Sequence, residues 1–254
     1  MNMAHGFFSQ CGPVGYEGRT CRGRIIGQCR ACGVKRVSAG VLRPGRVKNA
    51  LAIREAAPMV RAGDVIENPV TGERMTFLLT GIETRGELLR IDMGVRPGGF
   101  VAGEHIHPQQ EEHFRITSGQ ITLRASGEER RYTAGEHITI PPGTPHLWWN
   151  SGNDHLRVIL EFRPAGRFAE FITTFFALAH AGSTTKRGIP TNALQLAVTF
   201  AEYRDVIRGT SPPWSVQQVL FAVLNPLGRL LGYRPNVPYV EWFGDVPAIP
   251  HQSS

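Results

Sequence analysis

The chain has 254 residues, of which 41% are hydrophobic, and a formal net charge of +7. This composition is typical of a globular protein that can bury a core, and because it has no run of eighteen apolar residues, we expect no membrane-spanning helix. The charge is confined to one end: residues 1–48 hold nine Lys or Arg and one acidic residue, Glu17, so residues 49–254 carry −1. The body of the protein therefore lacks the charge of a nucleic-acid-binding domain.

Residues 1–58 are basic, Gly-rich and without hydrophobic periodicity, and we expect them to be a disordered extension. Such an arm could meet a polyanion, but we expect no nucleic-acid partner, because the charge is confined to the arm. The start of the chain lacks a basic stretch followed by an apolar run, so we expect no secretory signal and a cytoplasmic protein. Met59 begins a segment that holds the entire expected barrel, so the extension need not belong to the working protein.

All four cysteines lie in this segment, at positions 11, 21, 29 and 32. Cys29 and Cys32 form a C-x-x-C pair, but nine residues separate Cys11 from Cys21, so the second tight pair of a structural zinc site is missing. Because a cytosolic chain keeps its thiols reduced, we also expect no disulfides.

Residues 59–165 have the pattern of an all-β domain. Short apolar segments recur between turn signals such as Asn68-Pro69, Ser126-Gly127 and Ser151-Gly152. The expected strands cover residues 75–82, 87–95, 112–119, 120–126, 136–142, 146–150 and 156–162. Many short strands with regularly spaced turns predict a sandwich or a barrel.

Two histidines and a glutamate in GFVAGEHIHPQQEEHFRITSG (99–119) suggest a metal site. On a β-strand His105 and His107 point to the same side and can reach one ion. Glu112 lies an odd number of residues from His107, but a bend at Pro108, which has no backbone N–H, would return it to the histidines. Downstream, GEHITIPPGTPHLWWN (135–150) turns at Pro142-Gly143 and presents His146 as a fourth ligand.

These ligand types narrow the metal without naming it. Imidazole nitrogens with one carboxylate suit a divalent transition metal ion, namely Fe, Mn, Ni, Co or Zn. His113 and His137 have the opposite parity or lie outside the pattern, and we expect them to be ordinary strand residues. Glu111 is the main rival to Glu112 as a ligand, but its parity relative to Phe114 argues against it.

The two stretches resemble the two motifs of the cupin superfamily, in the form found in cupin type-2 barrel domains. The first motif reads Gly99, five residues, His105-x-His107, four residues, Glu112, six residues and Gly119. The second reads Gly135, five residues, Pro141-x-Gly143, two residues, His146, three residues and Asn150. The resemblance covers about residues 60 to 163. It implies a mainly β fold, a double-stranded β-helix or jelly-roll barrel, with the metal inside its mouth.

Alternation along the same strands predicts the surroundings of the metal. Phe114 and Ile116 share the face of Glu112, and Trp148 shares that of His146, so we expect these three to line an apolar pocket for a small-molecule substrate. The alternative, that Phe114 and Trp148 are core, stays open. The resemblance implies for Asn150 a role in turn and backbone bonding.

Beyond Gly166 the hydrophobic period becomes helical. Phe168, Phe171, Phe175 and their neighbours form an apolar stripe, and further helices are expected over 191–208 and 216–231, the last ended by Gly232. We expect residues 166–254 to form a helical extension of the barrel. Its stripes should pack on the barrel exterior or on a sister subunit in a homodimer rather than on lipid.

A metal held by three imidazoles and one carboxylate keeps two open positions, which suffice for a substrate together with dioxygen or water. We expect an oxygenase-like oxidoreductase, a metal-dependent dioxygenase, that acts on a small carbonyl or aromatic compound. The alternatives are a metal-dependent isomerase or lyase, and a non-catalytic cupin that binds a small molecule.

Overall fold

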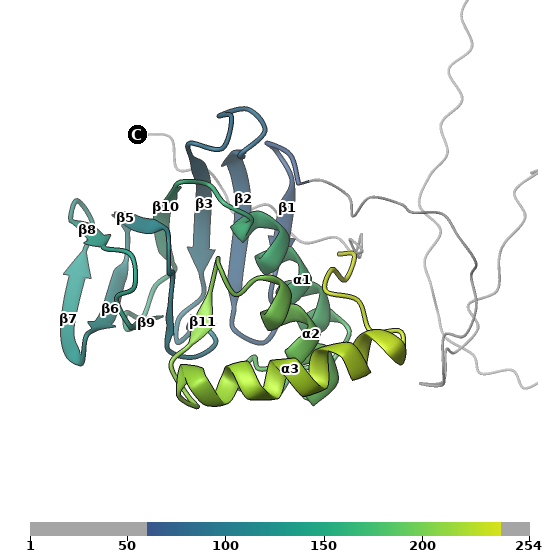
Figure 1. Cartoon of the computed structure of the whole chain (residues 1–254). Helices are drawn as coiled ribbons and strands as arrows, with labels where there is room; N and C mark the ends of the chain where they lie inside the picture. The colour runs from purple at the N-terminus through teal and green to yellow at the C-terminus, as the bar shows by residue number, and fades with distance from the viewer. Residues whose placement is uncertain (1–59, 240–254) are drawn as a thin grey trace, which may run out of the picture. The chain divides into compact units, whose positions relative to one another are not determined.

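The computed structural model describes residues 60–239, which fold into two antiparallel β-sheets followed by three helices (Figure 1). The first sheet has the order β1-β2-β3-β10-β5-β8 and the second the order β11-β4-β9-β6-β7. The strands are β1 (Val65–Glu67), β2 (Glu73–Leu79), β3 (Leu89–Val95), β4 (His105–Ile106), β5 (Glu111–Ser118), β6 (Gln120–Ala125), β7 (Glu128–Thr133), β8 (His137–Ile140), β9 (His146–Asn150), β10 (Leu156–Arg163) and β11 (Arg208–Gly209). The helices are α1 (Phe168–His180), α2 (Ala193–Glu202) and α3 (Trp214–Leu230).

The strands form the predicted jelly-roll barrel. Every second residue of β3 is buried, and the inward-facing side chains of both sheets form one hydrophobic core. The hydrophobic alternation that predicted the strands is thus the pattern that fills the barrel. Within the described residues no helix is long and apolar enough to span a membrane.

All seven predicted strands are present, and of the four other strands in the described residues, β7 and β11 gave no sequence signal. β7 is charged and exposed along almost its whole length, and it pairs antiparallel with β6 at the edge of the second sheet. β11 has two residues and pairs with β4 through Arg208↔Ile106 and Gly209↔His105. Neither strand has an apolar face, so no alternation could indicate it.

The predicted second helix was too long at its C-terminal end. α2 begins after Asn192, whose side-chain oxygen accepts hydrogen bonds from two backbone N–H groups, and it ends at Glu202 rather than near Arg208. Tyr203 and Val206 turn into the core instead, and the chain then pairs with the edge of β4. Pairing that edge satisfies backbone groups that a continued helix would leave unpaired.

The helices differ in how they meet the rest of the molecule. Figure 1 shows them grouped at one side, with β7 and β8 on the opposite side. Phe171 and Phe176 of α1 belong to the same core as the barrel strands. This agrees with the first of the two predicted partners of the helical stripe, the barrel itself. α3 instead exposes several apolar side chains, including Val219 and Leu230 at 65% and 83%.

Candidate metal centre and adjoining cavity

The four predicted ligands come together inside the barrel. His105 lies on β4, His107 directly follows that strand, and Glu112 and His146 lie on β5 and β9. All four are buried, and each offers one ligand atom within 4.8 Å of the others. Residues that are far apart in the sequence therefore form a compact group of metal-ligand atoms, as the two motifs predicted.

The expected bend at Pro108 is present and explains how Glu112 joins the group. The chain leaves strand geometry after Ile106 and begins β5 at Glu111. Gln110, which the sequence did not single out, is 2% exposed, and its amide nitrogen donates hydrogen bonds to the carbonyl oxygens of Pro164 and Ala165. A polar side chain buried in this way fixes the bend and so the direction of the Glu112 carboxylate.

Backbone carbonyls orient all three imidazoles. Nδ1 of His105 lies 3.0 Å from the Gly103 oxygen, and Nδ1 of His146 lies 2.9 Å from the Thr144 oxygen. Nδ1 of His107 lies 2.8 Å from the Val206 oxygen. A carbonyl oxygen can only accept, so each neutral ring carries its proton on Nδ1 and has a lone pair on Nε2. Metal-binding histidines typically donate such a hydrogen bond from the ring nitrogen that does not ligate.

Three ligand atoms face one another at the centre of the group, and no hydrogen-bond donor lies between them. Oε2 of Glu112 lies 2.8 Å from Nε2 of His146 and 3.7 Å from Nε2 of His107. These three atoms are buried and have no hydrogen-bond partner among residues 60–239. Converging lone pairs in a dry site repel one another unless a cation lies between them. The residues therefore fit a divalent metal ion.

The electrostatics of the ligand set favour the same conclusion. Burial, together with the neighbouring His146 and His107, holds the pKa of His105 well below its usual value. Burial also lowers the pKa of His107, although Glu112 opposes it. Burial acts in the same direction on His146, but the Glu112 carboxylate outweighs it and raises that pKa. Two imidazoles are therefore neutral and ready to ligate, while a proton would compete with the metal at the His146–Glu112 pair.

The residues that the sequence excluded as ligands lie outside the ligand group. Nε2 of His113 lies 2.6 Å from the carboxylate of Glu111, and both side chains are partly exposed. His137 is exposed. Asn150 donates from Nδ2 to the backbone oxygens of Val95, Arg96 and Asp154, which is the backbone-bonding role that the resemblance implied.

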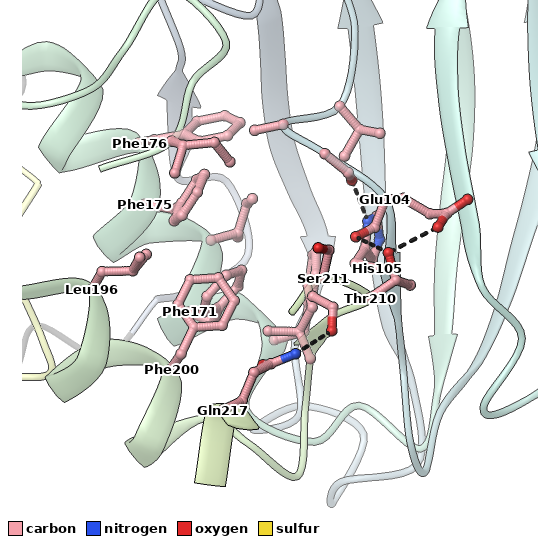
Figure 2. A pocket seen from close by; sticks show the side chains of 18 of the residues that line it. Glu104, His105, Phe171, Phe175, Phe176, Leu196, Phe200, Thr210, Ser211 and Gln217 are labelled. Carbon is pink, nitrogen blue, oxygen red and sulfur yellow. Dashed lines mark hydrogen bonds between the residues drawn. The ribbon is translucent and has the colours of Figure 1, made fainter. Parts of the chain in front are cut away.

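A cavity of about 440 Å³ adjoins the ligand group, and both His105 and Glu112 line it. Figure 2 shows Phe171, Phe175 and Phe176 of α1 with Leu196 and Phe200 of α2 across the cavity from His105, Glu104 and Thr210. Aromatic side chains from all three helices contribute, because Phe221 of α3 also lines it. No Lys or Arg of the described chain is among the lining residues.

Of the three predicted substrate-contacting residues, only Trp148 lines this cavity. Phe114 and Ile116 face inward, as expected, but lie in the barrel core with 1% of their surface exposed. The cavity gives no support to their predicted contact with a substrate. The main apolar wall consists instead of the helical Phe residues, which the sequence identified as a stripe without identifying what they face.

The segment after residue 165 also supports the ligands directly. The Val206 oxygen orients His107, and β11 pairs with the strand that carries His105. Thr210 donates a hydrogen bond from its hydroxyl to Glu104, which precedes His105. Gln217 of α3 donates to the Gly209 oxygen and so ties that helix to β11. The C-terminal segment is therefore part of the site.

Comparison with known proteins identifies similar chains. Residues 91–162 match the family model described as a cupin domain. An oxidoreductase of Arthrobotrys oligospora is 29% identical over 203 residues, which cover 70% of this chain and 78% of the relative. The probable oxidoreductase virH of Hypocrea virens is 26% identical over 151 residues, 55% of this chain and 66% of the relative. The tetracenomycin polyketide synthase protein TcmJ of Streptomyces glaucescens is 32% identical over 81 residues, 32% of this chain and about half of the relative, 52%.

Proposed function

We propose that this chain, which contains a cupin domain at residues 91–162, is a metal-dependent oxidoreductase of the oxygenase type. Its substrate would be a small, uncharged carbonyl or aromatic compound. The observation that carries the proposal is the position of the ligand group: four convergent ligand atoms lie at the wall of an apolar, aromatic cavity. A divalent transition metal held by His105, His107, Glu112 and His146 would supply Lewis-acid or redox chemistry at that wall.

The cavity walls indicate how the chain would bind the substrate. A volume of about 440 Å³ lies within the usual range of small-molecule sites. The Phe side chains of α1 and α2 offer ring faces and edges to a flat compound, and a compound packed against them would keep water from the ligand group. Water would otherwise compete with the substrate for the positions that the protein ligands leave open.

Away from the metal, the side chains that line the cavity disfavour anionic groups. Glu73, Glu104 and Glu112 line the cavity, whereas none of its described lining residues is a Lys or Arg. A carboxylate or phosphate ester would lose its hydration there without gaining a counter-ion from these side chains. This charge pattern favours a neutral substrate.

The names of the relatives support an oxidative reaction. The two relatives that align over more than half of this chain are both named oxidoreductases. A third is named a polyketide synthase protein, and polyketides are carbonyl-rich compounds that can cyclise to aromatic rings. A neutral carbonyl or aromatic substrate would agree with all three names.

Oxygen consumption tests the proposal. The iron-loaded protein should consume oxygen with at least one member of a panel of β-diketones, catechols and flavonoids, and the His146→Ala variant should not. Uptake that never exceeds that of the variant would contradict an oxygenase. If a zinc- or manganese-loaded form then rearranged or cleaved a panel member without oxygen, the protein would be an isomerase or lyase. Stoichiometric binding without turnover would identify a binding protein.

A further inference from the structure

One carboxyl group in the cavity lies outside the ligand group. Glu73 is the first residue of β2, is 4% exposed and lines the same cavity as His105. It is not one of the four residues whose ligand atoms converge. The next inward residues of its strand, Met75 and Phe77, are apolar core residues, so Glu73 interrupts an otherwise apolar face.

Among residues 60–239 no ion pair explains this burial. The neighbouring Arg74 places Nε 2.6 Å from the Glu67 carboxylate. Arg96, whose side chain lies against Gly72, donates from Nη2 to the backbone oxygens of Pro69 and Val70. A buried carboxyl without a cation is costly when ionised. Burial accordingly raises the pKa of Glu73 to about 8, although a hydrogen bond from Thr71 opposes the shift.

The local structure holds the carboxyl in one orientation and leaves it half satisfied. The Thr71 hydroxyl donates to Oε2 of Glu73 at 2.7 Å. Thr71 is itself fully buried, and its backbone N–H donates to the side chain of Asn68. Oε1 of Glu73 has no hydrogen bond within residues 60–239. The protein has thus positioned a carboxyl that retains hydrogen-bonding capacity in an apolar cavity.

We propose that Glu73 is a specificity residue that hydrogen-bonds an oxygen atom of the substrate. The inference rests on the proposed function and adds to it the class of compound. The substrate would be a neutral, largely apolar molecule with two separate oxygen functions, one for the metal site and a ketone, enol or phenol oxygen for Glu73. A protonated carboxyl can donate to a carbonyl oxygen and accept from a hydroxyl, which an apolar wall cannot do. A compound that lacks this oxygen leaves the carboxyl unsatisfied and is disfavoured.

A matched pair of probes tests the proposal by binding alone. 2-Acetylnaphthalene and 2-isopropenylnaphthalene have the same shape, but the second carries C=CH₂ in place of the carbonyl, and neither titrates. Their affinities would be measured by fluorescence titration of the full-length, zinc-loaded protein near pH 6.5, where Glu73 is protonated. The wild type should prefer the ketone by about tenfold, the worth of one satisfied buried hydrogen bond.

Two substitutions at Glu73 and one control complete the test. Glu73→Met should abolish the preference by weakening the ketone alone, whereas Glu73→Gln, which keeps a donor, should retain most of it. Glu67→Met is the matched control, because Glu67 lies on the neighbouring strand β1 and pairs with Arg74 but does not line the cavity. The preference should survive in that variant. If Glu73→Met keeps it, or if Glu67→Met abolishes it as well, Glu73 is not the specificity residue.

The pH dependence provides a second measurement that stands even if Glu73→Met does not fold. In the wild type the preference should fall as pH rises from 7 to 9, because the ionised carboxyl cannot donate. In Glu73→Gln it should stay constant, although Glu104, His105 and Glu112 still line the cavity. A preference that falls equally in both proteins would overturn the proposal. These experiments measure binding and not turnover. Their failure can therefore be distinguished from a failure of the oxygen-uptake assay, which tests the proposed function.

Discussion

The two walls of the cavity differ in how strictly their residue types and spacing are constrained. The barrel wall carries a few polar side chains whose identity and spacing are fixed, because three imidazoles and a carboxylate must converge on one point. The helical wall consists mainly of Phe side chains from α1 and α2, which need only fill space and exclude water. The barrel wall would therefore determine which ion is bound, and the helical wall which molecules reach it. Breaking each wall separately should have separable effects.

The largest effect should come from removing the helical wall. A chain that ends at residue 165 would expose the barrel surface under α1 and would lose the Val206 carbonyl that orients His107. We expect it to aggregate and, in any soluble fraction, to hold little metal. Size-exclusion chromatography with elemental analysis measures both properties. A soluble, fully loaded 1–165 chain would show that the helices are an independent appendage.

A single substitution in the barrel wall should abolish metal binding. His107→Ala removes one of the four ligand atoms from a buried site, and we expect stoichiometric metal to be lost. His113→Ala is the control, because His113 lies on the outer face beside Glu111. Elemental analysis of both variants, purified without chelator or affinity metal, decides the assignment. The assignment fails if the His113 variant loses the metal and the His107 variant keeps it.

The pH dependence of stability tests a second feature of the barrel wall. Glu73 is a buried carboxyl of this wall, but it is not one of the four metal ligands. The pKa of its carboxyl is raised from 4.5 to about 8 in the folded protein. Between these values the folded chain binds more protons than the unfolded chain, so the free energy of unfolding falls as pH rises. Relative to Glu73→Gln, the wild type should lose roughly 2 kcal/mol between pH 6 and pH 8. Urea unfolding at the two pH values measures the difference, and a pH-independent difference would refute the raised pKa.

The smallest effects should separate Trp148 from Phe114. Trp148 lines the cavity, whereas Phe114 packs against it from the core, with the two ring centres 6.4 Å apart. Trp148→Phe should weaken the binding of an aromatic ligand several-fold with little change in metal content. Phe114→Leu should cost about 1 kcal/mol of stability and leave ligand binding unchanged. Equal effects of both substitutions on ligand affinity would place Phe114 in the binding wall after all.

The difference between the barrel wall and the helical wall also explains which parts of the site the sequence could predict. His105, His107, Glu112 and His146 were identifiable because metal geometry restricts both residue type and strand parity. The Phe stripe of α1 indicated a buried helix face, but a stripe does not say what covers it, so its place at the cavity could not be predicted. The alternation of β2 places Glu73 with Met75 and Phe77, which is a signal that sequence reasoning could have used. β11 had no such signal, because two residues show no period and their position depends on pairing with β4.

The expectations for residues 1–58 lie outside the described part of the chain. They concern a basic, disordered extension, cysteines without a zinc site or disulfides, and whether the extension belongs to the working protein. The homodimer and the cytoplasmic location likewise remain predictions. Among these, the cysteines matter most for the metal assignment, because they offer the one competing set of metal ligands that the sequence suggests.

X-ray absorption spectroscopy at the edge of the metal that copurifies with the full-length protein tests the central claim most directly. With His105, His107, Glu112 and His146 as ligands, the spectrum should show imidazole scattering from three rings and a first shell of nitrogen and oxygen at roughly 2.0–2.2 Å. His107→Ala should lose this signal with its metal. A sulfur shell at about 2.3 Å would assign the metal to the cysteines and contradict the account.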